Sequence, residues 1–190
     1  MMENKKREIV MVPYQADWPE KFQAEAAALY PVFWMCWRAV YHIGSTAVPG
    51  LASKPTLDIL LSVHDITKVD TLDEAVADLG YTPKGEYGIP GRRYYHQGDQ
   101  VHFFHLHVFG YTSTEIERHI LFRDFLRSHP EETRAYESLK MKLAEIHRYD
   151  PNAYTDGKDE FIREMDARAL QWKQKTGWRL PAPDWIPEAM

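Results

Sequence analysis

The sequence has almost none of the cysteine that builds disulfide frameworks and thiolate metal clusters. Cys36 is the only cysteine among 190 residues, so neither kind of site can form within this chain. A single thiol fits a reducing compartment, and a free cysteine usually behaves as a small hydrophobic side chain. We therefore expect Cys36 to lie in the core of a cytoplasmic protein.

Long apolar runs and an excess of positive charge are also lacking. The longest apolar run, 26–37, has twelve residues and contains Pro31, whereas a membrane-spanning helix needs about 20. The first residues include Lys5, Lys6 and Arg7 but no apolar stretch typical of a leader. The net charge of −5 gives no electrostatic reason for a nucleic-acid or membrane partner. A small anionic ligand would need a local basic patch.

Composition and the last residues predict one domain and a tail. Hydrophobic residues make up 44% and charged residues 27% of the sequence. This composition is typical of a globular chain that folds without disulfides or structural metals. We assign 1–176 to a single domain and 177–190 to a tail with three prolines and two tryptophans. The lack of periodicity there favours disorder, whereas Trp178 and Trp185 favour docking on the domain or on a second subunit. The apolar cluster at 33–37 is expected in the core, with a homodimer interface as the alternative.

Strand patterns come first along the chain and helix patterns come last. Strands are predicted at 9–13, 37–43, 56–63, 81–84, 93–97 and 102–109. Helices are predicted to begin at Asp17 and to cover 67–79, 114–127, 130–147 and 151–175. The strand at 56–63 is apolar enough to be central, and a turn at Gly98 and Asp99 would join the last two strands as a hairpin. We therefore predict an α+β fold, with a mixed β-sheet flanked by helices and a helical C-terminal part.

The stretch HIGSTAVPGLASKPTLDILL at 42–61 contains a turn typical of phosphate binding. Gly44 lets the backbone approach an anion without a Cβ, and Ser45 offers a hydroxyl and an N–H group to phosphate oxygens. Asp58, on the strand that follows, is a carboxylate that can hold Mg²⁺ and is the candidate catalytic residue. One inward carboxylate is one fewer than two-metal chemistry needs.

His105 and His107 alternate with Leu106 on the last predicted strand. Successive side chains of a strand point to opposite faces, so the two imidazoles should point the same way. If they share the face of Asp58, one carboxylate and two imidazoles form a set typical of Zn²⁺, Mn²⁺ or Fe²⁺ and less typical of Mg²⁺. The alternative is a pair of polar side chains on a half-exposed face.

Four further residues are candidates for binding phosphate. Arg92 and Arg93 follow a glycine-rich loop at 85–91, and arginine fits phosphate bidentately, although a solvated turn is the alternative. Lys54 lies between the turn and the acidic strand, where it either neutralises phosphate or is an ordinary surface lysine. His42 either orients a ligand or is a structural histidine. No role is assigned to His64, His96, His119, His129 and His147.

Four features together point to a known family: HIGSTAVPGLASKPTLDIL at 42–60, GEYGIPGRRYY at 85–95, HLHVF at 105–109, and a late helix with Tyr154 and Lys158. With these features the chain resembles the GrpB family over about residues 9–166. The family in turn looks like a branch of the nucleotidyltransferase superfamily. The resemblance implies a sheet of the nucleotidyltransferase type, in which acidic residues hold two metals that assist attack on the α-phosphate of a nucleoside triphosphate.

Carried over to this chain, the resemblance places Gly44 and Ser45 at the phosphate-side turn and Asp58 at one acidic position. The second acidic position would be Thr56 or Leu60, and neither side chain ligates as a carboxylate does. The third would be His105 or His107. This chain therefore departs from the two-Mg²⁺ pattern of the superfamily.

Three functions are compatible with this pattern. The first is transfer of a nucleotidyl group to a small acceptor with a divalent metal, Mg²⁺, Mn²⁺ or Zn²⁺. The second is a degenerate module that binds a nucleotide or another phosphorylated small molecule without chemistry. The third is a metal-dependent hydrolase that uses Asp58 and the pair His105 and His107.

Overall fold

Five strands form one mixed sheet in the computed structural model, which describes residues 8–98 and 103–187. The sheet has the order β1-β2-β5-β4-β3, with β2 and β5 parallel and the other neighbours antiparallel. The strands are β1 (Trp37–Ile43), β2 (Leu57–Val63), β3 (Tyr81–Pro83), β4 (Arg92–Gln97) and β5 (Phe104–Gly110). The predicted mixed sheet is confirmed, whereas Asp99 of the predicted hairpin turn and His102 lie outside the described residues.

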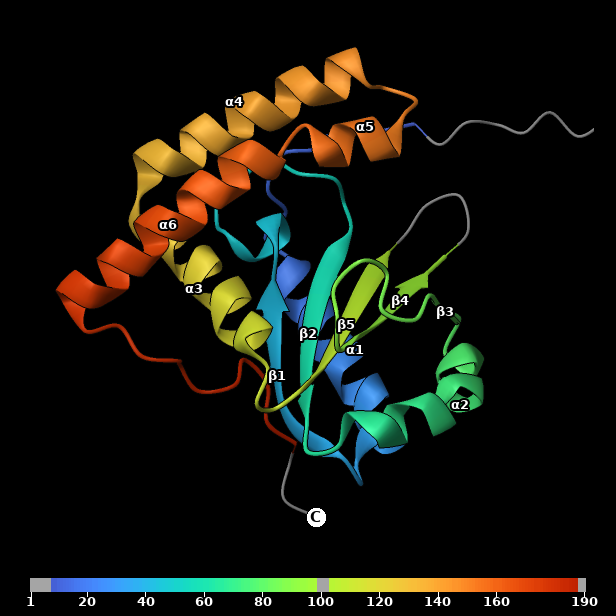
Figure 1. Ribbon diagram of the computed structural model, residues 1–190. Helices are drawn as coiled ribbons and strands as arrows, with labels where there is room; N and C mark the ends of the chain where they lie inside the picture. Colours follow the sequence, from blue (N-terminus) through green and yellow to red (C-terminus); the bar gives the residue numbers. More distant parts are fainter. Residues whose placement is uncertain (1–7, 99–102, 188–190) are drawn as a thin grey trace, which may run out of the picture.

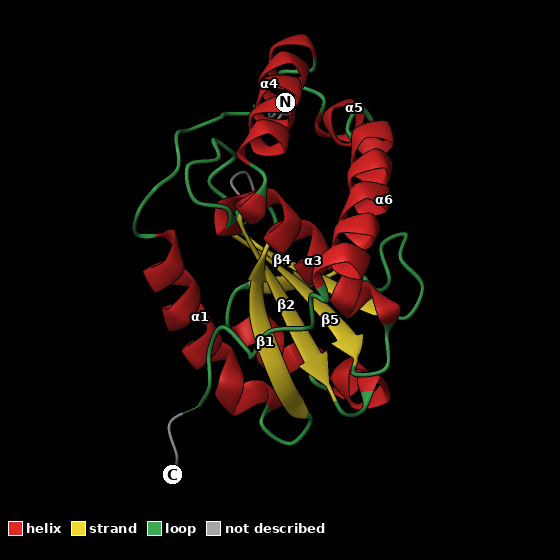
Figure 2. Ribbon diagram, turned by 90° about the vertical axis from the view of Figure 1, so that its left-hand side faces the viewer, coloured by secondary structure: helices red, strands yellow, loops and turns green. Residues whose placement is uncertain are grey.

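Helices cover both faces of the sheet, and Figure 2 shows α1 on one side and α3 on the other. The helices are α1 (Trp18–Phe33), α2 (Asp73–Asp78), α3 (Thr114–Ser128), α4 (Pro130–Ile146), α5 (Pro151–Asp156) and α6 (Asp159–Thr176), with 3₁₀ turns η1 (Ser45–Ala47) and η2 (Ile66–Thr71). This arrangement confirms the predicted α+β fold with a helical C-terminal part. None of the helices in the described part of the chain combines the length and the apolar character needed to cross a bilayer.

The two faces of β2 pack into different parts of the core. Ile59 and Leu61 are fully buried in the cluster that includes α1, where Phe22 lies on the helix face expected from the sequence. On the opposite face, Leu60 packs with Ile120 of α3. Both faces of this strand are therefore covered, which explains its nearly continuous apolar sequence.

The C-terminal helices α4, α5 and α6 gather at the end of the sheet where β2 begins (Figure 1). The sequence predicted one helix at 151–175, but the chain breaks between α5 and α6. At the break, a Cβ on Gly157 would lie 2.6 Å from Leu143 Cδ2 of α4. The glycine allows close packing of this corner on α4, and it brings Lys158 to the start of α6.

Two other predicted elements differ from the structure. Within the described part of the chain, the segment predicted as a strand at 9–13 forms a single bridge, between Val12 and Ser53, because Ile9 packs against residues of α4 and α5 instead of joining the sheet. The predicted helix at 67–79 is split into η2 and α2. Here the Thr71 hydroxyl donates to the Lys68 carbonyl, a local bond that competes with a continuous α-helix.

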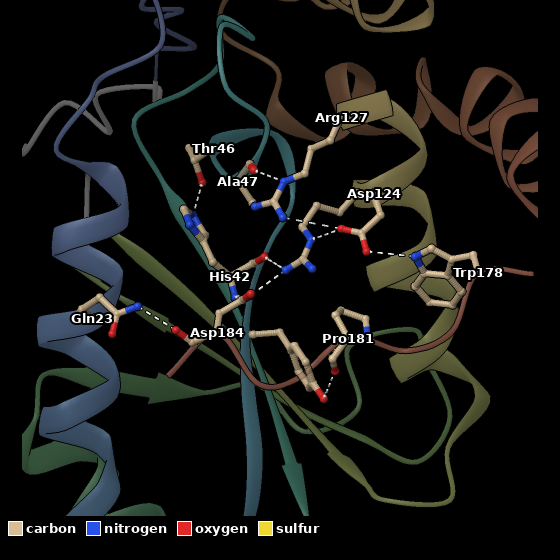
Figure 3. A network of polar contacts seen from close by, with 11 residues as sticks. Gln23, His42, Thr46, Ala47, Asp124, Arg127, Trp178, Pro181 and Asp184 are labelled. Carbon is tan, nitrogen blue, oxygen red and sulfur yellow. Dashed lines mark hydrogen bonds and ion pairs between the residues drawn. The ribbon is translucent and has the colours of Figure 1, made fainter. Parts of the chain in front are cut away.

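The tail docks on the domain, as one of the two readings of its tryptophans predicted. Trp185 forms a β-bridge with Val40 of the edge strand β1, and its ring packs 5.5 Å from that of Trp37, centroid to centroid. The Trp178 indole donates to Asp124 of α3 at 3.1 Å (Figure 3). The tail therefore covers part of a strand edge that would otherwise be open for pairing.

The apolar cluster at 33–37 is only partly in the core. Phe33 and Cys36 are buried as expected, but Trp34 is 59% exposed and Met35 is 69% exposed. The two exposed side chains lie on the corner between α1 and β1 and point outward because the chain reverses direction there. The expectation that the whole cluster is core is therefore wrong, and the homodimer interface stays a prediction.

Candidate functional site

Asp58, His105 and His107 meet on one face of the sheet. In the parallel pair of β2 and β5, Asp58 lies opposite His105 and Leu60 lies opposite His107. The carboxylate oxygen Oδ1 of Asp58 is 3.0 Å from Nδ1 of His105 and 3.5 Å from Nε2 of His107. The two imidazoles thus point the same way, as strand alternation predicted, and the structure shows that Asp58 is on their face, which the sequence left open.

The electrostatics of Asp58 favour its ionised form. Burial alone would raise the pKa of this carboxyl, but the hydrogen bonds and charges of His105 and His107 hold its pKa well below the usual range. Burial also lowers the pKa of His107, despite the opposing effect of Asp58. Asp58 is therefore a carboxylate with its negative charge directed at two imidazoles.

The donor set fits one divalent ion. One ligand atom from each of Asp58, His105 and His107 lies within 4.8 Å of the others, and the Asp58 side chain is 27% exposed. Carboxylate with imidazole is a set for Zn²⁺, Mn²⁺ or Fe²⁺ rather than Mg²⁺. The neighbouring positions Thr56 and Leu60 are buried and bring no second carboxylate. This set differs from the two-metal arrangement that the superfamily resemblance implies.

The turn after β1 lies against the other side of the Asp58 carboxylate. Gly44 has a φ of 71° and a ψ of −170°, a conformation open essentially to glycine alone. A Cβ at this position would overlap Oδ2 of Asp58. Ser45 begins η1, and its side chain is hydrogen-bonded to Tyr136 of α4. The turn therefore connects the carboxylate to the C-terminal helices.

His42, in β1, contacts the turn through Thr46. Its Nε2 is 2.9 Å from the Thr46 hydroxyl, and its ring stacks on Phe22. The ring is 4% exposed, and burial lowers its pKa to about 4, so it is neutral at physiological pH. On the other side of η1, Arg127 donates to the Ala47 carbonyl at 2.8 Å (Figure 3). These contacts give His42 a structural position next to the turn.

Three lysines from three segments surround Tyr154 and Tyr136. The Nζ atoms of Lys54 and Lys158 are 5.1 and 4.6 Å from the centre of the Tyr154 ring. Lys140 is 2% exposed, with its Nζ 4.9 Å from the centre of the Tyr136 ring. The sequence singled out Lys54, and the resemblance included Lys158, but nothing in the sequence pointed to Lys140.

Burial and neighbouring positive charge lower the pKa of two of these lysines. Burial, with the charges of Lys158 and Lys54, lowers the pKa of Lys140 to about 7, against the opposing charge of Glu137. Burial and the charge of Lys54 lower the pKa of Lys158 to about 8, against the opposing charge of Asp58. The positive charge of Lys158 therefore lies near enough to the Asp58 carboxylate for the two charges to interact. A bound anion would favour the charged form of each lysine and so raise its pKa.

The two candidate arginines are on opposite faces of the sheet. Arg92 shares the face of His107 and is 5% exposed. It donates through Nε to the Glu86 carbonyl at 3.1 Å and through Nη2 to the Tyr87 carbonyl. Arg93 points to the other face, where it forms an ion pair with Asp70 of η2. The structure thus brings Arg92, at the start of β4, next to His107 with its side chain bonded to the loop, and it does not bring Arg93 there.

His119, which the sequence left without a role, lies beside the histidine pair. Its ring centre is 5.9 Å from that of His107, and burial, with the charges of Arg118, His107 and Arg92, lowers its pKa to about 3. Its Nδ1 faces the Glu115 carbonyl at 2.7 Å. No local pattern could have found this neighbour, because α3 follows the sheet strands and its contact depends on how the helix packs.

A family described as GrpB protein matches residues 8–168. The chain belongs to the GrpB family. A solved structure, the conserved protein GrpB from Enterococcus faecalis, has a TM-score of 0.83 and 38% identity, covering 87% of this chain and 99% of that one. This GrpB-family chain therefore has the fold of a solved relative over most of its length.

A curated relative and a second solved structure extend the comparison. The UPF0157 protein YqkA of Bacillus subtilis is 42% identical over 169 residues, which cover 89% of this chain and 49% of YqkA. The GrpB-family chain thus spans about half the length of that relative. Terminal uridylyl transferase 4 from Trypanosoma brucei with bound CTP has a TM-score of 0.45 and 14% identity, covering 90% of this chain and 58% of that one. A likeness that remote assigns no activity.

Proposed function

We propose that this GrpB-family protein binds a nucleoside triphosphate, or a similar phosphorylated small molecule, together with one divalent metal, and transfers the nucleotidyl group of a triphosphate to a small acceptor with diphosphate as the leaving group. The observation that carries the proposal is the convergence of opposite charges at one place. Asp58 and its histidines lie on one side of the Gly44 turn, and Lys158, whose pKa responds to the charge of Asp58, belongs to the lysine cluster. A phosphate chain and its metal need this combination of cationic and anionic groups.

The residues have separate roles in this proposal. The lysines Lys54, Lys140 and Lys158 neutralise the phosphate chain, and the turn at Gly44 and Ser45 offers backbone N–H groups and a hydroxyl to its oxygens. Asp58 and the histidine pair hold the metal, which when bound withdraws charge from the phosphate oxygens. Burial of the cluster strengthens each of these interactions relative to water.

A thermal-shift panel tests the proposal, with nucleoside triphosphates and Mg²⁺, Mn²⁺ or Zn²⁺ on the wild type, Asp58→Asn and Asp70→Asn. Asp70 is the matched control because its carboxylate pairs with Arg93 on the opposite face. A ligand at 100 times its Kd should raise Tm by about 5–10 °C in a chain of this size. We expect a metal-dependent shift that is lost in Asp58→Asn and kept in Asp70→Asn. No shift with any nucleotide would overturn the proposal.

A degenerate binding module is the second candidate, and one observation favours it. Thr56 and Leu60 stand where the superfamily pattern would place a second carboxylate, and both are buried. With a single carboxylate, a second metal would be weakly held. Mass spectrometry after incubation of the nucleotide with metal and a mixture of small-molecule acceptors separates the candidates. A thermal shift without any product supports the binding module, and free phosphate or diphosphate without a modified acceptor indicates hydrolysis.

A further inference from the structure

The glycine-rich loop that joins β3 to β4 turns back over the sheet and is bonded to it (Figure 1). The backbone N–H of Tyr94 donates to the Gly85 carbonyl at 2.8 Å. The Glu86 carboxylate accepts from the backbone N–H of Gly91 at 2.6 Å, and the Arg92 side chain donates to the Glu86 carbonyl at 3.1 Å. The side chains of the loop are therefore held at defined positions relative to β4.

Tyr87, in the middle of this loop, combines an ordered ring with a large exposed area. Its ring stacks on that of Tyr94, with 4.9 Å between the ring centres and 9° between the planes, yet the residue is 62% exposed. One face of the Tyr87 ring therefore lies against Tyr94, and the other face is open to solvent. Because aromatic rings attract further planar rings in an offset stack, the open face is suited to binding one.

The backbone at Tyr87 has a conformation that favours glycine. Its φ is 44°, and within residues 8–98 and 103–187 every other residue with a positive φ is a glycine. A tyrosine in this region is strained, and the bond that Arg92 donates to its carbonyl holds it there. Residues strained in this way cluster at ligand-binding sites. Here the strain is kept at the residue whose ring is both stacked and exposed, which indicates a role for that ring.

The stacked pair of tyrosines lies next to the candidate metal site. The Tyr94 ring meets the ring of His107 nearly edge-on, with 5.2 Å between the centres, and its centre is 5.5 Å from that of His105. A single ring thus separates Tyr87 from the two histidines that face Asp58. In a nucleotide, a single ribose separates the base from the phosphates, so a base stacked on Tyr87 leaves its phosphates on the side of the metal site.

We propose that Tyr87 binds the base of the nucleotide by stacking, and that this contact gives nucleoside triphosphates an affinity that inorganic polyphosphates do not gain. Every nucleobase has a π-face, so the contact recognises a base without selecting one kind. Recognition is then divided between the loop, which binds the base, and the turn at Gly44, which binds the phosphates. This inference rests on the proposed function, because it takes the phosphates to bind at that turn.

Calorimetric titration with ATP, CTP and inorganic tripolyphosphate, each with Mn²⁺, tests the contact on the wild type, Tyr87→Ala and Tyr87→Phe. Tyr111→Ala is the matched control, because Tyr111 is 50% exposed and follows the far end of β5. We expect Tyr87→Ala to lower the affinity for both nucleotides at least about fivefold and that for tripolyphosphate less than about twofold. Tyr87→Phe keeps the ring and should bind all three ligands like the wild type, as should the control.

The tripolyphosphate titration separates failure of the stacking contact from failure of the proposed function. Unchanged nucleotide affinity in Tyr87→Ala, or an equal loss for tripolyphosphate, overturns the stacking contact and leaves the phosphate site standing. If the wild type binds none of the three ligands, the proposed function fails. Saturation-transfer NMR with adenosine and cytidine, which carry no phosphate, then decides the role of Tyr87. Transfer to the base protons that is lost in Tyr87→Ala supports the contact, and no transfer in the wild type overturns it.

Discussion

The backbone of Gly44 lies directly against the carboxylate of Asp58. A side chain at position 44 would overlap Oδ2 of Asp58, and the other carboxylate oxygen faces His105 and His107. Both oxygens of the carboxylate are thus located by their neighbours, one by the turn and one by the histidines. The turn and the acidic strand therefore act as one unit, although they are separated along the chain.

This relationship makes Gly44→Ala a sharp test, with Gly50→Ala as its matched control. Both glycines have positive φ, 71° and 81°, but an added Cβ at Gly50 meets nothing within 4 Å. The control should cost only the backbone strain of about 1–3 kcal/mol. Gly44→Ala should cost more and should also abolish nucleotide-induced stabilisation, because Asp58 has to move. Denaturant unfolding and thermal shift measure the two effects, and equal behaviour of the two variants would contradict the close approach.

The residues of the candidate site that could be predicted are those with a local signal. Gly44 and Ser45 follow a strand in a recognisable turn, and His105 and His107 share a face because strand alternation has a period of two. Whether that face was also the face of Asp58 depended on the strand order, which no local pattern contains. The parallel pairing of β2 with β5 supplied the answer.

The residues that could not be predicted depend on tertiary packing. Lys140 has the sequence context of a surface lysine on an amphipathic helix, yet its Nζ donates to the Ala52 carbonyl at 2.6 Å, far away in the sequence. For Trp34 and Met35 the error is the reverse. The apolar run predicted buried side chains, but both are exposed because the chain reverses direction at this corner. Hydrophobicity along the sequence says little about a corner between two elements.

Lys140 should contribute to phosphate binding despite its burial. We expect Lys140→Met to weaken binding of a nucleoside triphosphate at least about tenfold, since a charge-assisted hydrogen bond is worth about 1.5–3 kcal/mol. Lys142→Met is the matched control, because Lys142 is exposed on the same helix. Isothermal titration calorimetry at pH 7 gives both affinities. If the two variants bind equally well, Lys140 is a structural residue that only supports the Ala52 segment.

Binding of a phosphate ligand should take up protons above neutral pH. The pKa values of Lys140 and Lys158, about 7 and about 8, mean that both are partly neutral at pH 8. A bound polyanion favours the charged form and raises both pKa values, so protons are taken up and affinity falls as pH rises from 7 to 9. Calorimetry at pH 8 in two buffers with different heats of ionisation measures the uptake. Proton release on binding, or none, would show that these lysines do not face the ligand.

Asp184 should hold the tail next to the turn, because its carboxylate bonds to both β1 and α3. Its Oδ2 accepts from the backbone N–H of His42 at 2.9 Å and from Nη1 of Arg123 (Figure 3). Arg123 is 2% exposed, so Asp184→Ala leaves a buried guanidinium whose remaining partners among the described residues are Asp124 and the His42 carbonyl. We expect a loss of about 1–3 kcal/mol in unfolding free energy, measured by denaturant titration.

The same variant should also release the end of the tail. Because Trp185 forms its bridge to β1 at the residue after Asp184, its indole should become more exposed to water and its fluorescence should shift to longer wavelength. Asp78→Ala, at an exposed position at the end of α2, is the control and should change stability by less than about 0.5 kcal/mol. A large loss of stability without the spectral shift would separate the two roles: Asp184 would then neutralise Arg123, while the aromatic packing of Trp185 on Trp37 alone would hold the tail on the edge of the sheet.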